Sequence, residues 1–462
     1  MEQRQRAKRA DLLSPTASGT ETGRAIVIEP WLKREVRGEA GRAPAETRTP
    51  EARLEEAAGL ARAIDLNVVE QGLVTLNNVR PATYVGTGKV DEIAGLVKGH
   101  SASVVVMDCP ISPVQQRNLE KAWGAKVIDR TGLILEIFGR RARTREGALQ
   151  VEHAHLNYQK SRLVRSWTHL ERQRGGYGFL GGPGETQLEA DRRVIEDRIK
   201  RIEGELDKVK RTRKLHRDSR KRVPYPIVAL VGYTNAGKST LFNRMTAASV
   251  LSVDMLFATL DPTMRGLKLA SGRAIILSDT VGFIADLPHE LVAAFRATLE
   301  EVLEADVILH IRDAAHAETE AQKGDVLKVL DELGIEADGE RPMLEVLNKI
   351  DLLDSEDRAA LLARAKRGGP VAVSALTGEG VPVLLSRIEE ALGAGETVFR
   401  LHLDSSDGAG LAWAYKHGRV VNRRDRADGL SLTVAVDPAD VDRFAARYGN
   451  RLSLDHALRR AS

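Results

Sequence analysis

The N-terminal third of the chain alternates short apolar runs with longer segments whose apolar residues have helical spacing. Runs of apolar or alternating residues predict strands, whereas apolar residues three and four apart predict helices. In chain order, these patterns predict a strand at 25–28, a helix at 51–64, a strand at 67–76, a helix at 89–98, a strand at 103–107 and a helix at 113–123. Strands that alternate with helices indicate a small, mostly parallel sheet, which we assign to a domain over residues 24–140.

Two long helices are predicted next, within residues 141–223. Apolar residues recur at spacings of seven, or of four and three, in two sets: Leu149, Leu156, Leu163 and Leu170, then Ile195, Ile199, Ile202, Leu206 and Val209. Both sets describe one coiled-coil seam, so we expect an antiparallel helical hairpin. The second helix, from about residue 185 to its end before Pro224, would be about 55 Å long and is expected to project from a globular body.

Patterns of buried strands return in residues 224–394. They lie at 227–231, 274–277, 343–347 and 371–373. These runs predict a parallel sheet, and Ser271 with Gly272 predicts a hairpin that adds an antiparallel edge.

The two ends of the chain differ from this central part. Residues 395–462 carry strand patterns at 398–403 and 431–435 around a helical pattern at 409–416, which predicts a small α+β domain. Residues 1–23 are polar, basic and without periodicity, and we expect a disordered tail. The predicted fold class is therefore α/β and multidomain.

Composition limits the class of protein. The chain has 462 residues, too many for one core, and its 42% hydrophobic and 29% charged content is typical of soluble globular proteins. The single cysteine, Cys109, excludes an internal disulfide framework, and three preceding valines predict that it is buried. No apolar run reaches the length of a membrane span, and no signal peptide is recognisable, so a cytoplasmic location is expected.

Charge is clustered although the net charge is only +4. Nine basic residues lie between Lys208 and Arg222 against one acidic residue, and a second basic run covers 140–145. Between the two hairpin helices, the glycine-rich segment 174–193 adds Tyr177, Phe179 and arginines, a composition typical of loops that insert into folded RNA. The alternatives are solvated helix faces for the charges and a flexible connector for the loop.

The sequence GYTNAGKS, from Gly232 to Ser239, fits the phosphate-loop pattern and follows a predicted strand. Its glycines let backbone N–H groups turn toward phosphates, and the following helix directs its positive end at them. Lys238 is expected to neutralise phosphate charge and Ser239 to bind Mg²⁺. An ordinary strand-to-helix turn is the alternative, which the later motifs make less attractive.

The expected phosphate and metal site is completed by three more residues later in the chain. Asp279 ends a predicted strand, where its carboxylate can reach Mg²⁺ through water. Gly282, the last residue of DTVG, leaves a backbone N–H for the terminal phosphate. Thr259 lies in a stretch without periodicity, as expected of a loop that is ordered by that phosphate and Mg²⁺. A surface threonine is the alternative for this position.

The sequence NKID, Asn348 to Asp351, selects the base. A carboxylate accepts two hydrogen bonds from an edge with adjacent N–H and NH₂ groups, which guanine has and adenine lacks. Lys349 can cover the ring, Asn348 can brace the loop, and the N–H of Ala375 within SAL can donate to the guanine oxygen. GTP is therefore expected to be preferred over ATP.

Phe283 follows DTVG at the position where many switch GTPases carry a glutamine that orients the attacking water. A phenyl ring forms no such hydrogen bond, so we expect slow hydrolysis alone and acceleration by a large partner. The alternative is a core phenylalanine, with water positioned by another residue.

Longer segments around these motifs carry a resemblance to a known family: GGYGFLGGPGETQLEADRR, GYTNAGKS, FATLDPTMR, DTVGFI and GTGKVDEI. Over nearly its whole length the chain resembles the HflX family of ribosome-associated P-loop GTPases. The resemblance implies GTP as substrate, Mg²⁺ as cofactor, and the large (50S) ribosomal subunit with its rRNA as partner. Some members separate stalled ribosomes, with the hairpin directed toward the peptidyl-transferase region. Asn235 resembles the asparagine of potassium-stimulated relatives, which implies K⁺ as a further ion, and we expect a monomer.

By this resemblance, catalytic roles fall on Lys238, Thr259 and Gly282, and metal binding on Ser239 and Thr259. Nucleotide-binding roles fall on Gly232, Tyr233, Thr234, Asn235, Ala236, Gly237, Lys238, Ser239, Phe257, Ala258, Thr259, Leu260, Asp261, Asp279, Thr280, Val281, Gly282, Asn348, Lys349, Ile350, Asp351, Ser374, Ala375 and Leu376. The segment GTGK at Gly86 resembles half a phosphate loop, for which a helix-start turn is the favoured interpretation and a second nucleotide site the alternative.

Two other classes of function stay open. An assembly factor or RNA-binding chaperone would use GTP only to tune its affinity for RNA. A signalling switch would bind a protein partner and would show little dependence on salt, unlike a protein that contacts several phosphates.

Overall fold

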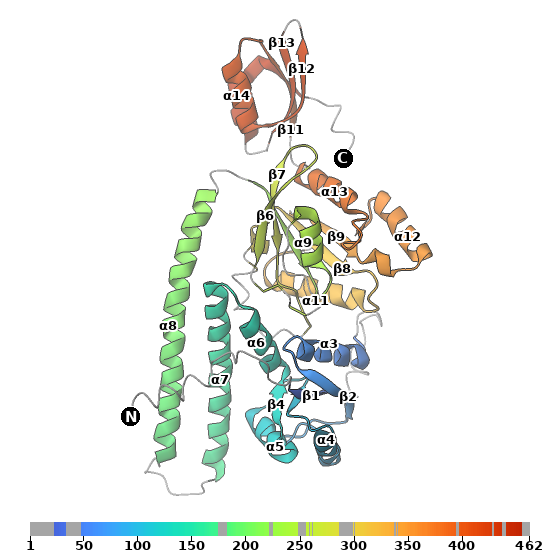
Figure 1. Cartoon of the computed structure of the whole chain (residues 1–462). Coiled ribbons are helices and arrows are strands. Elements are labelled where there is room, and N and C mark those ends of the chain that lie inside the picture. Colours follow the sequence, from blue (N-terminus) through green and yellow to red (C-terminus); the bar gives the residue numbers. More distant parts are fainter. Residues whose placement is uncertain are drawn as a thin grey trace. The chain divides into compact units, whose positions relative to one another are not determined.

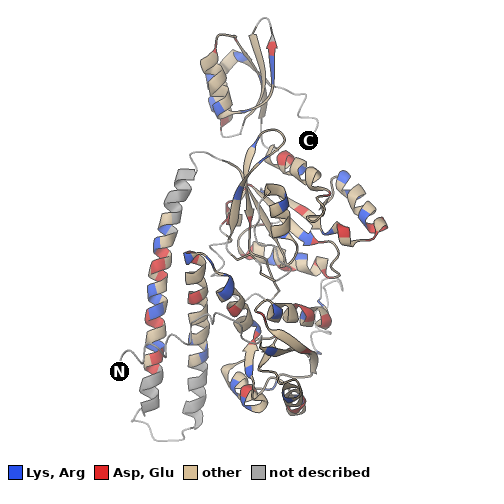
Figure 2. Ribbon diagram, in the orientation of Figure 1, with Lys and Arg blue, Asp and Glu red and all other residues tan. Residues whose placement is uncertain are grey.

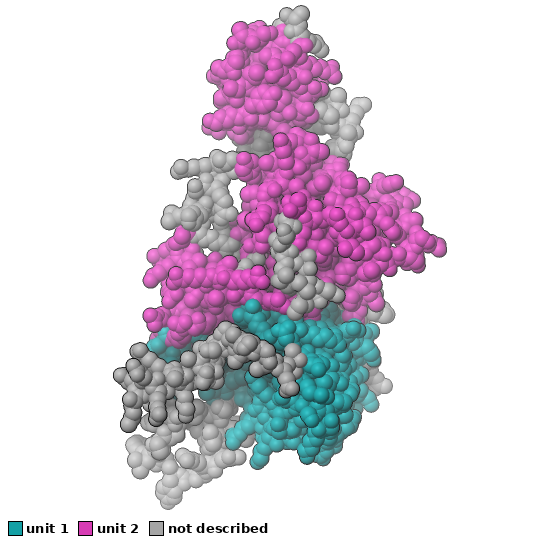
Figure 3. All heavy atoms as spheres, viewed as in Figure 1, with its two compact units in different colours: residues 1–42, 48–140, 155–197 teal, residues 43–47, 141–154, 198–462 magenta. Residues whose placement is uncertain are grey.

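The computed structural model describes residues 23–33, 48–173, 183–220, 225–247, 256–257, 259–260, 262–285, 299, 301–336, 339, 341–393, 397–426, 429–436 and 440–454. They form two compact units, residues 1–42, 48–140 and 155–197, and residues 43–47, 141–154 and 198–462 (Figure 3). The predicted tail, residues 1–22, and the centre of the hairpin tip, residues 174–182, lie outside the described residues.

The first unit contains a parallel sheet of four strands in the order β2-β1-β3-β4 (Figure 1). Its elements are β1 (Arg24–Leu32), α3 (Pro50–Arg62), β2 (Asn67–Leu76), α4 (Thr87–Gly99), β3 (Val104–Met107), α5 (Pro113–Trp123), β4 (Lys126–Asp129) and α6 (Arg130–Arg141). The predicted strands and helices are confirmed, and β4 and α6 are additional. Cys109 is buried, as predicted.

Local signals explain where these helices begin and end. Ser112 and Gln115 form a capping box at the start of α5, and Gly124 ends that helix in the left-handed conformation. Gly86 is the N-cap of α4, so GTGK forms the turn that starts a helix, as favoured above. The Trp123 indole donates to the Val90 carbonyl at 3.0 Å and joins α5 to α4.

The predicted hairpin consists of α7 (Arg145–Gln173) and α8 (Pro183–Arg220), which run side by side (Figure 1). Three ion pairs prove that the helices are antiparallel, because residue numbers rise on α7 as they fall on α8: Arg145–Glu205, Glu152–Arg198 and Lys160–Glu196. Both charge signs alternate along the described part of α8 (Figure 2), and most side chains of the basic run 208–222 lie outside the described residues.

The first helix of the hairpin also contacts the four-stranded sheet. Tyr158 on α7 donates from its hydroxyl to Asp129 Oδ1 at 2.5 Å, and the Arg162 guanidinium pairs with the other oxygen of the same carboxylate. Asp129 ends β4 and is 3% exposed. The middle of α7 is therefore bound to the carboxyl edge of the four-stranded sheet, because buried charges need partners there.

A six-stranded sheet in the order β10-β9-β8-β5-β7-β6 forms the centre of the second unit. Its elements are β5 (Ile227–Gly232), α9 (Lys238–Thr246), β6 (Thr263–Lys268), β7 (Ala274–Asp279), β8 (Val307–Asp313), α11 (Thr319–Glu332), β9 (Met343–Asn348), η2 (Ile350–Leu352), α12 (Ser355–Lys366), β10 (Val371–Ala372) and α13 (Val381–Gly393). Every pairing is parallel except that of β6 with β7, which confirms the predicted antiparallel edge.

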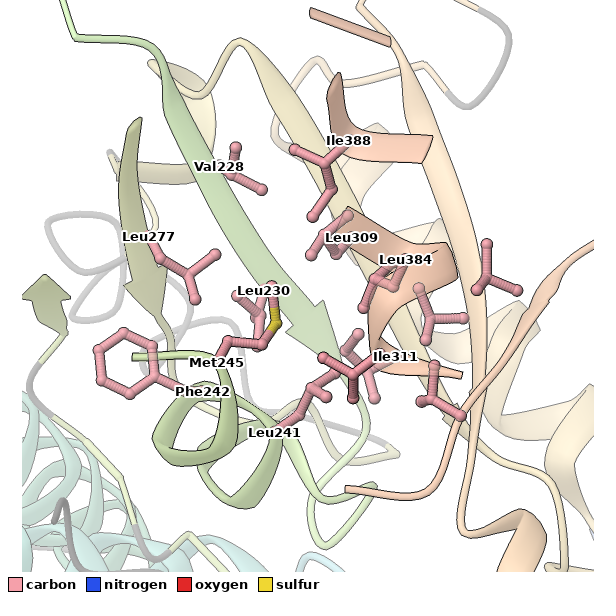
Figure 4. Close-up of a cluster of buried hydrophobic side chains, with 14 of the residues drawn as sticks. Val228, Leu230, Leu241, Phe242, Met245, Leu277, Leu309, Ile311, Leu384 and Ile388 are labelled. Carbon is pink, nitrogen blue, oxygen red and sulfur yellow. The ribbon is translucent and has the colours of Figure 1, made fainter. Parts of the chain in front are cut away.

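The core of this sheet lies where α9 and α13 cover one of its faces (Figure 4). Leu230 and Ile311 point from β5 and β8 toward Phe242 of α9 and Leu384 of α13, and all four are fully buried. This packing fixes the strand β5 and the start of α9, between which the phosphate loop lies.

The predicted α+β domain at the C-terminal end is an antiparallel sheet in the order β12-β13-β11-β14. Its elements are β11 (Thr397–Leu403), α14 (Gly408–His417), β12 (Arg419–Arg426), β13 (Gly429–Val436), α15 (Val441–Tyr448), η4 (Gly449–Arg451) and β14 (Leu452–Leu454). Phe444 and Tyr448 of α15 pack against Trp413 of α14, and the Tyr448 hydroxyl donates to the Gly410 carbonyl at 2.7 Å.

Candidate nucleotide site

The phosphate loop connects the carboxyl end of β5 to the N-terminus of α9, and two of its glycines are required by close contacts. A Cβ on Gly232 would lie 2.1 Å from the Ile311 carbonyl oxygen, and one on Gly237 would lie 2.2 Å from Asn348 Nδ2. Gly237 also has φ of +87°, a left-handed value that side chains disfavour. Asn235 is exposed with φ of 61°, and Ala236 is buried.

Lys238 begins α9 and is 6% exposed. Its ammonium donates to the carbonyl oxygens of Gly232 at 3.1 Å and Tyr233 at 2.8 Å, so the side chain folds back along the loop. Burial lowers the pKa of Lys238 to about 8, although the Asp279 charge acts in the opposite direction. This lysine is therefore an ammonium held in a desolvated place, which an arriving phosphate would stabilise.

Three oxygen-bearing side chains meet beside the loop. Ser239 Oγ donates to Asp279 Oδ2 at 2.7 Å and lies 2.8 Å from Thr259 Oγ1, and the Thr259 hydroxyl donates to the same carboxylate oxygen at 3.2 Å. Burial raises the pKa of Asp279 above its ordinary value, against the opposing effect of these hydroxyls. Two hydroxyls and a buried carboxylate are hard oxygen ligands, so the group fits Mg²⁺.

The DTVG segment runs from the end of β7 into the loop. The Thr280 hydroxyl donates to the Leu230 carbonyl at 2.5 Å, and Val281 is buried. Gly282 lies directly against the phosphate loop, since a Cβ there would be 2.8 Å from Thr234 Cα and 3.0 Å from Lys238 Nζ. Phe283 is 2% exposed, so it is a core residue, as the alternative interpretation held.

The motifs NKID and SAL lie at the ends of β9 and β10. Asn348 donates from Nδ2 to the Ala236 carbonyl at 2.9 Å and accepts from the Ala375 N–H at 3.0 Å, so it braces both loops. The Ser374 hydroxyl donates to Asp351 Oδ1 at 2.5 Å. Because the Ala375 N–H is donated to Asn348 here, its contact with guanine stays a prediction. The Leu376 side chain is exposed.

Most of the predicted residues are thus brought to one edge of the sheet. Phe257 and Leu260 are buried near Thr259 in sequence, and Ile350 is buried in η2. Ala258 and Asp261 lie outside the described residues.

Two further residues at this edge were not predicted. Asp313 forms an ion pair with Lys349 at 2.8 Å and orients it, and Arg244 donates to the Ala375 carbonyl at 3.1 Å. Asp313 ends the buried strand β8 just as Asp279 ends β7, and that signal was available in the sequence. Arg244 carried no such signal, because it is one of many arginines on helices.

Four family models match consecutive parts of the chain. They are described as GTP-binding GTPase N-terminal (residues 51–139), GTP-binding GTPase Middle Region (141–220), 50S ribosome-binding GTPase (227–349) and HflX C-terminal domain (360–456). A GTPase HflX of Magnetococcus marinus is 51% identical over 391 residues, which cover 85% of this chain and 89% of that protein. The chain belongs to the HflX family of GTPases.

Other relatives agree with this assignment. GTPase HflX of Escherichia coli is 50% identical over 363 residues, covering 78% of this chain and 84% of that protein. The HflX protein of Lacrimispora saccharolytica is 42% identical over 384 residues, covering 83% and 89%. The predicted family and the predicted GTPase activity are thus confirmed. Among the described helices, none combines the length and the apolar character that a bilayer crossing requires.

Proposed function

We propose that this HflX GTPase binds GTP with Mg²⁺ at the site just described, associates with the large (50S) ribosomal subunit and its rRNA, and leaves after hydrolysis. Splitting or rescue of stalled ribosomes is the task that we assign to this cycle. The observation that carries the proposal is the meeting of Thr259 with Ser239 and Asp279. Thr259 comes from a separate segment, so a triphosphate with its metal can order that segment and change the surface offered to the ribosome.

The chain's own residues account for recognition of the triphosphate. Lys238 supplies positive charge, and Gly282 lies beside it, so that its backbone N–H is available to a terminal phosphate. Ser239 and Thr259 would hold Mg²⁺, with Asp279 behind them; when bound, the ion supplies neutralisation of charge between the outer phosphates. Hydrolysis removes the phosphate that joins these segments.

Guanine selection rests on Asp351. Its carboxylate is oriented by the Ser374 hydroxyl, and a carboxylate pairs with the N–H and NH₂ edge of guanine. Adenine would present an acceptor to it, which would cost about 1–3 kcal/mol or more.

The attacking water must be oriented by a hydrogen-bonding group, and Phe283 does not supply one. The ring of Phe283 is buried and has no hydrogen-bonding group, so it cannot orient the attacking water. We therefore propose that hydrolysis is weak in isolation and is stimulated by the ribosomal partner, which would supply or order the missing group.

Further parts of the proposal follow from the family. Asn235, exposed in the phosphate loop, is proposed to bring K⁺ to the phosphates, which a comparison of GTP turnover in KCl and NaCl would test. We also propose a monomer that works in the cytoplasm, where ribosomes are.

Cosedimentation tests the central proposal. The full chain is mixed with 30S, 50S and 70S particles in the presence of GTP, a non-hydrolysable GTP analogue or GDP. We expect retention on 50S with the analogue, release with GDP, and separation of 70S particles with GTP. A matched variant that lacks residues 174–184 should turn over GTP alone at the normal rate but lose the association.

The other readings predict different results. RNA affinity that differs between GTP and GDP, without any separation of 70S particles into subunits, would favour the assembly factor or chaperone. Association that does not weaken with added salt would contradict binding to rRNA phosphates and favour a protein partner.

A further inference from the structure

The segment that follows Gly282 is hydrogen-bonded to the phosphate loop as if it were a short extra strand. The Phe283 N–H donates to the Gly232 carbonyl at 3.1 Å, and the Thr234 N–H donates to the Phe283 carbonyl at 2.7 Å. Together they form a parallel bridge between Tyr233 and Phe283. Backbone hydrogen bonds therefore connect the segment after Gly282 directly to the phosphate loop.

The Tyr233 side chain extends this connection by one bond. Its hydroxyl oxygen accepts the N–H of Ala285 at 2.8 Å, and both residues are buried, at 4% and 8% exposure. A buried backbone N–H without an acceptor is costly, so the phenolic oxygen determines whether Ala285 can stay in this place. A phenylalanine at 233 would fill the same space and lack the acceptor.

Hydrogen bonds hold the chain in place both before and after Gly282. Before it, the Thr280 hydroxyl is bonded to the Leu230 carbonyl; after it, Phe283 and Ala285 are bonded to the phosphate loop. Between the two anchors, Gly282 lies so close to Lys238 that a Cβ would be 3.0 Å from the ammonium nitrogen. Loss of the second anchor would let Gly282 move away from Lys238 and the phosphate loop.

We propose that Tyr233 is a positioning residue for GTP hydrolysis, which holds residues 283–285 on the phosphate loop and thereby fixes Gly282 beside Lys238. The proposal rests on the proposed nucleotide site. Tyr233 acts through the backbone of another segment, so it should affect the rate of hydrolysis more than the binding of nucleotide. A group aimed at the reacting phosphate gains from being held in place before the reaction.

The test is Tyr233→Phe in the full chain, with turnover of GTP by the protein alone as the main readout. A lost acceptor for a buried donor costs about 1–3 kcal/mol, so we expect kcat to fall about tenfold. KM for GTP and Kd for GDP should stay within about twofold, because the phosphate loop itself keeps its contacts. Unchanged or increased kcat would overturn the proposal, as would an equal loss of GDP affinity.

Tyr448→Phe is the matched control. The Tyr448 hydroxyl is also bonded to a backbone group, the Gly410 carbonyl, and Tyr448 is 5% exposed. Removing it should lower thermal stability and leave kcat unchanged. If both variants lower kcat equally, the effect is a general loss of stability and the proposal fails.

Hydrogen exchange gives an independent readout. In Tyr233→Phe the amides of residues 283–285 should exchange about tenfold faster than in the wild type, and in Tyr448→Phe they should not. If Tyr233→Phe does not fold, hydrogen exchange of the wild-type protein tests the proposal instead. An Ala285 amide that exchanges freely, while the amides of β7 are protected, would overturn it. Failure of the proposed function is recognised separately, because the wild type would then lack GTP turnover or guanine preference.

Discussion

Raising the pH above about 8 should weaken the binding of GDP and GTP. Burial lowers the pKa of Lys238 to about 8 in the free protein. A bound phosphate favours the charged form and raises this pKa again, so binding at high pH must take up a proton. At pH 9 about one lysine in eleven is protonated, which predicts about tenfold weaker binding than at pH 7, or about 1.4 kcal/mol.

The assay is a titration with GDP, which avoids hydrolysis, between about pH 6.5 and 9.5. Calorimetry in two buffers of different ionisation enthalpy counts the protons taken up. Lys238→Arg is the matched control, because its guanidinium stays charged over this range. Guanine itself loses a proton at high pH, and that effect is common to both proteins, so the difference between their curves belongs to the lysine.

Stability of the nucleotide-free protein should change in the opposite direction. The pKa of Lys238 is lower in the folded chain than in the unfolded one, so the unfolded chain binds more protons between about pH 8 and 10.5. The contribution of this group to the free energy of unfolding therefore rises with pH in that window, while the affinity for nucleotide falls.

A wild-type affinity curve for GDP that is as flat from pH 7 to 9 as that of Lys238→Arg would refute the role of the Lys238 charge.

Four other substitutions have expected outcomes. Asp351→Asn should weaken the binding of guanine nucleotides and strengthen that of xanthine nucleotides, each by about tenfold or more, in binding titrations. An unchanged preference for guanine would show that Asp351 does not contact the base. Gly237→Ala should abolish GDP binding, measured by calorimetry, because its Cβ would lie 2.2 Å from Asn348 Nδ2 at φ of +87°. Arg162→Ala breaks a largely buried ion pair and should cost about 3 kcal/mol in urea unfolding. Arg198→Ala, whose ion pair is about 40% exposed, should cost less than about 1 kcal/mol, and equal losses would contradict the bound hairpin.

The strand β8 was not predicted because its apolar run, Val307 to Leu309, is short and is followed by polar residues. All seven residues of β8 are buried, including His310 and Arg312. Arg312 is paired with Glu345 and Glu320, and burial lowers the pKa of His310 to about 4, which keeps it neutral in the core. The ion pairs with Glu345 and Glu320 let Arg312 lie inside the core, and the sequence alone does not show these pairings.

The family and most helices and strands followed from sequence alone, as did the residues that we propose for the guanine site. Repeats of apolar residues reflect the periods of helix and strand, and the residue types around a phosphate loop or a guanine-binding carboxylate are restricted by hydrogen-bond geometry. Both kinds of information are local, so they can be recognised in the sequence without knowledge of the fold.

Tertiary structure decided which of these local pieces touch. The binding of Arg162 to Asp129, the ion pair of Lys349 with Asp313, and the hydrogen bond from Ala285 to Tyr233 each join segments that packing brings together. Such contacts depend on strand register and helix placement, which many sequences of the same local pattern could satisfy differently. Only the folded chain shows that the hairpin contacts a sheet and that the Tyr233 hydroxyl accepts a hydrogen bond from the segment after Gly282.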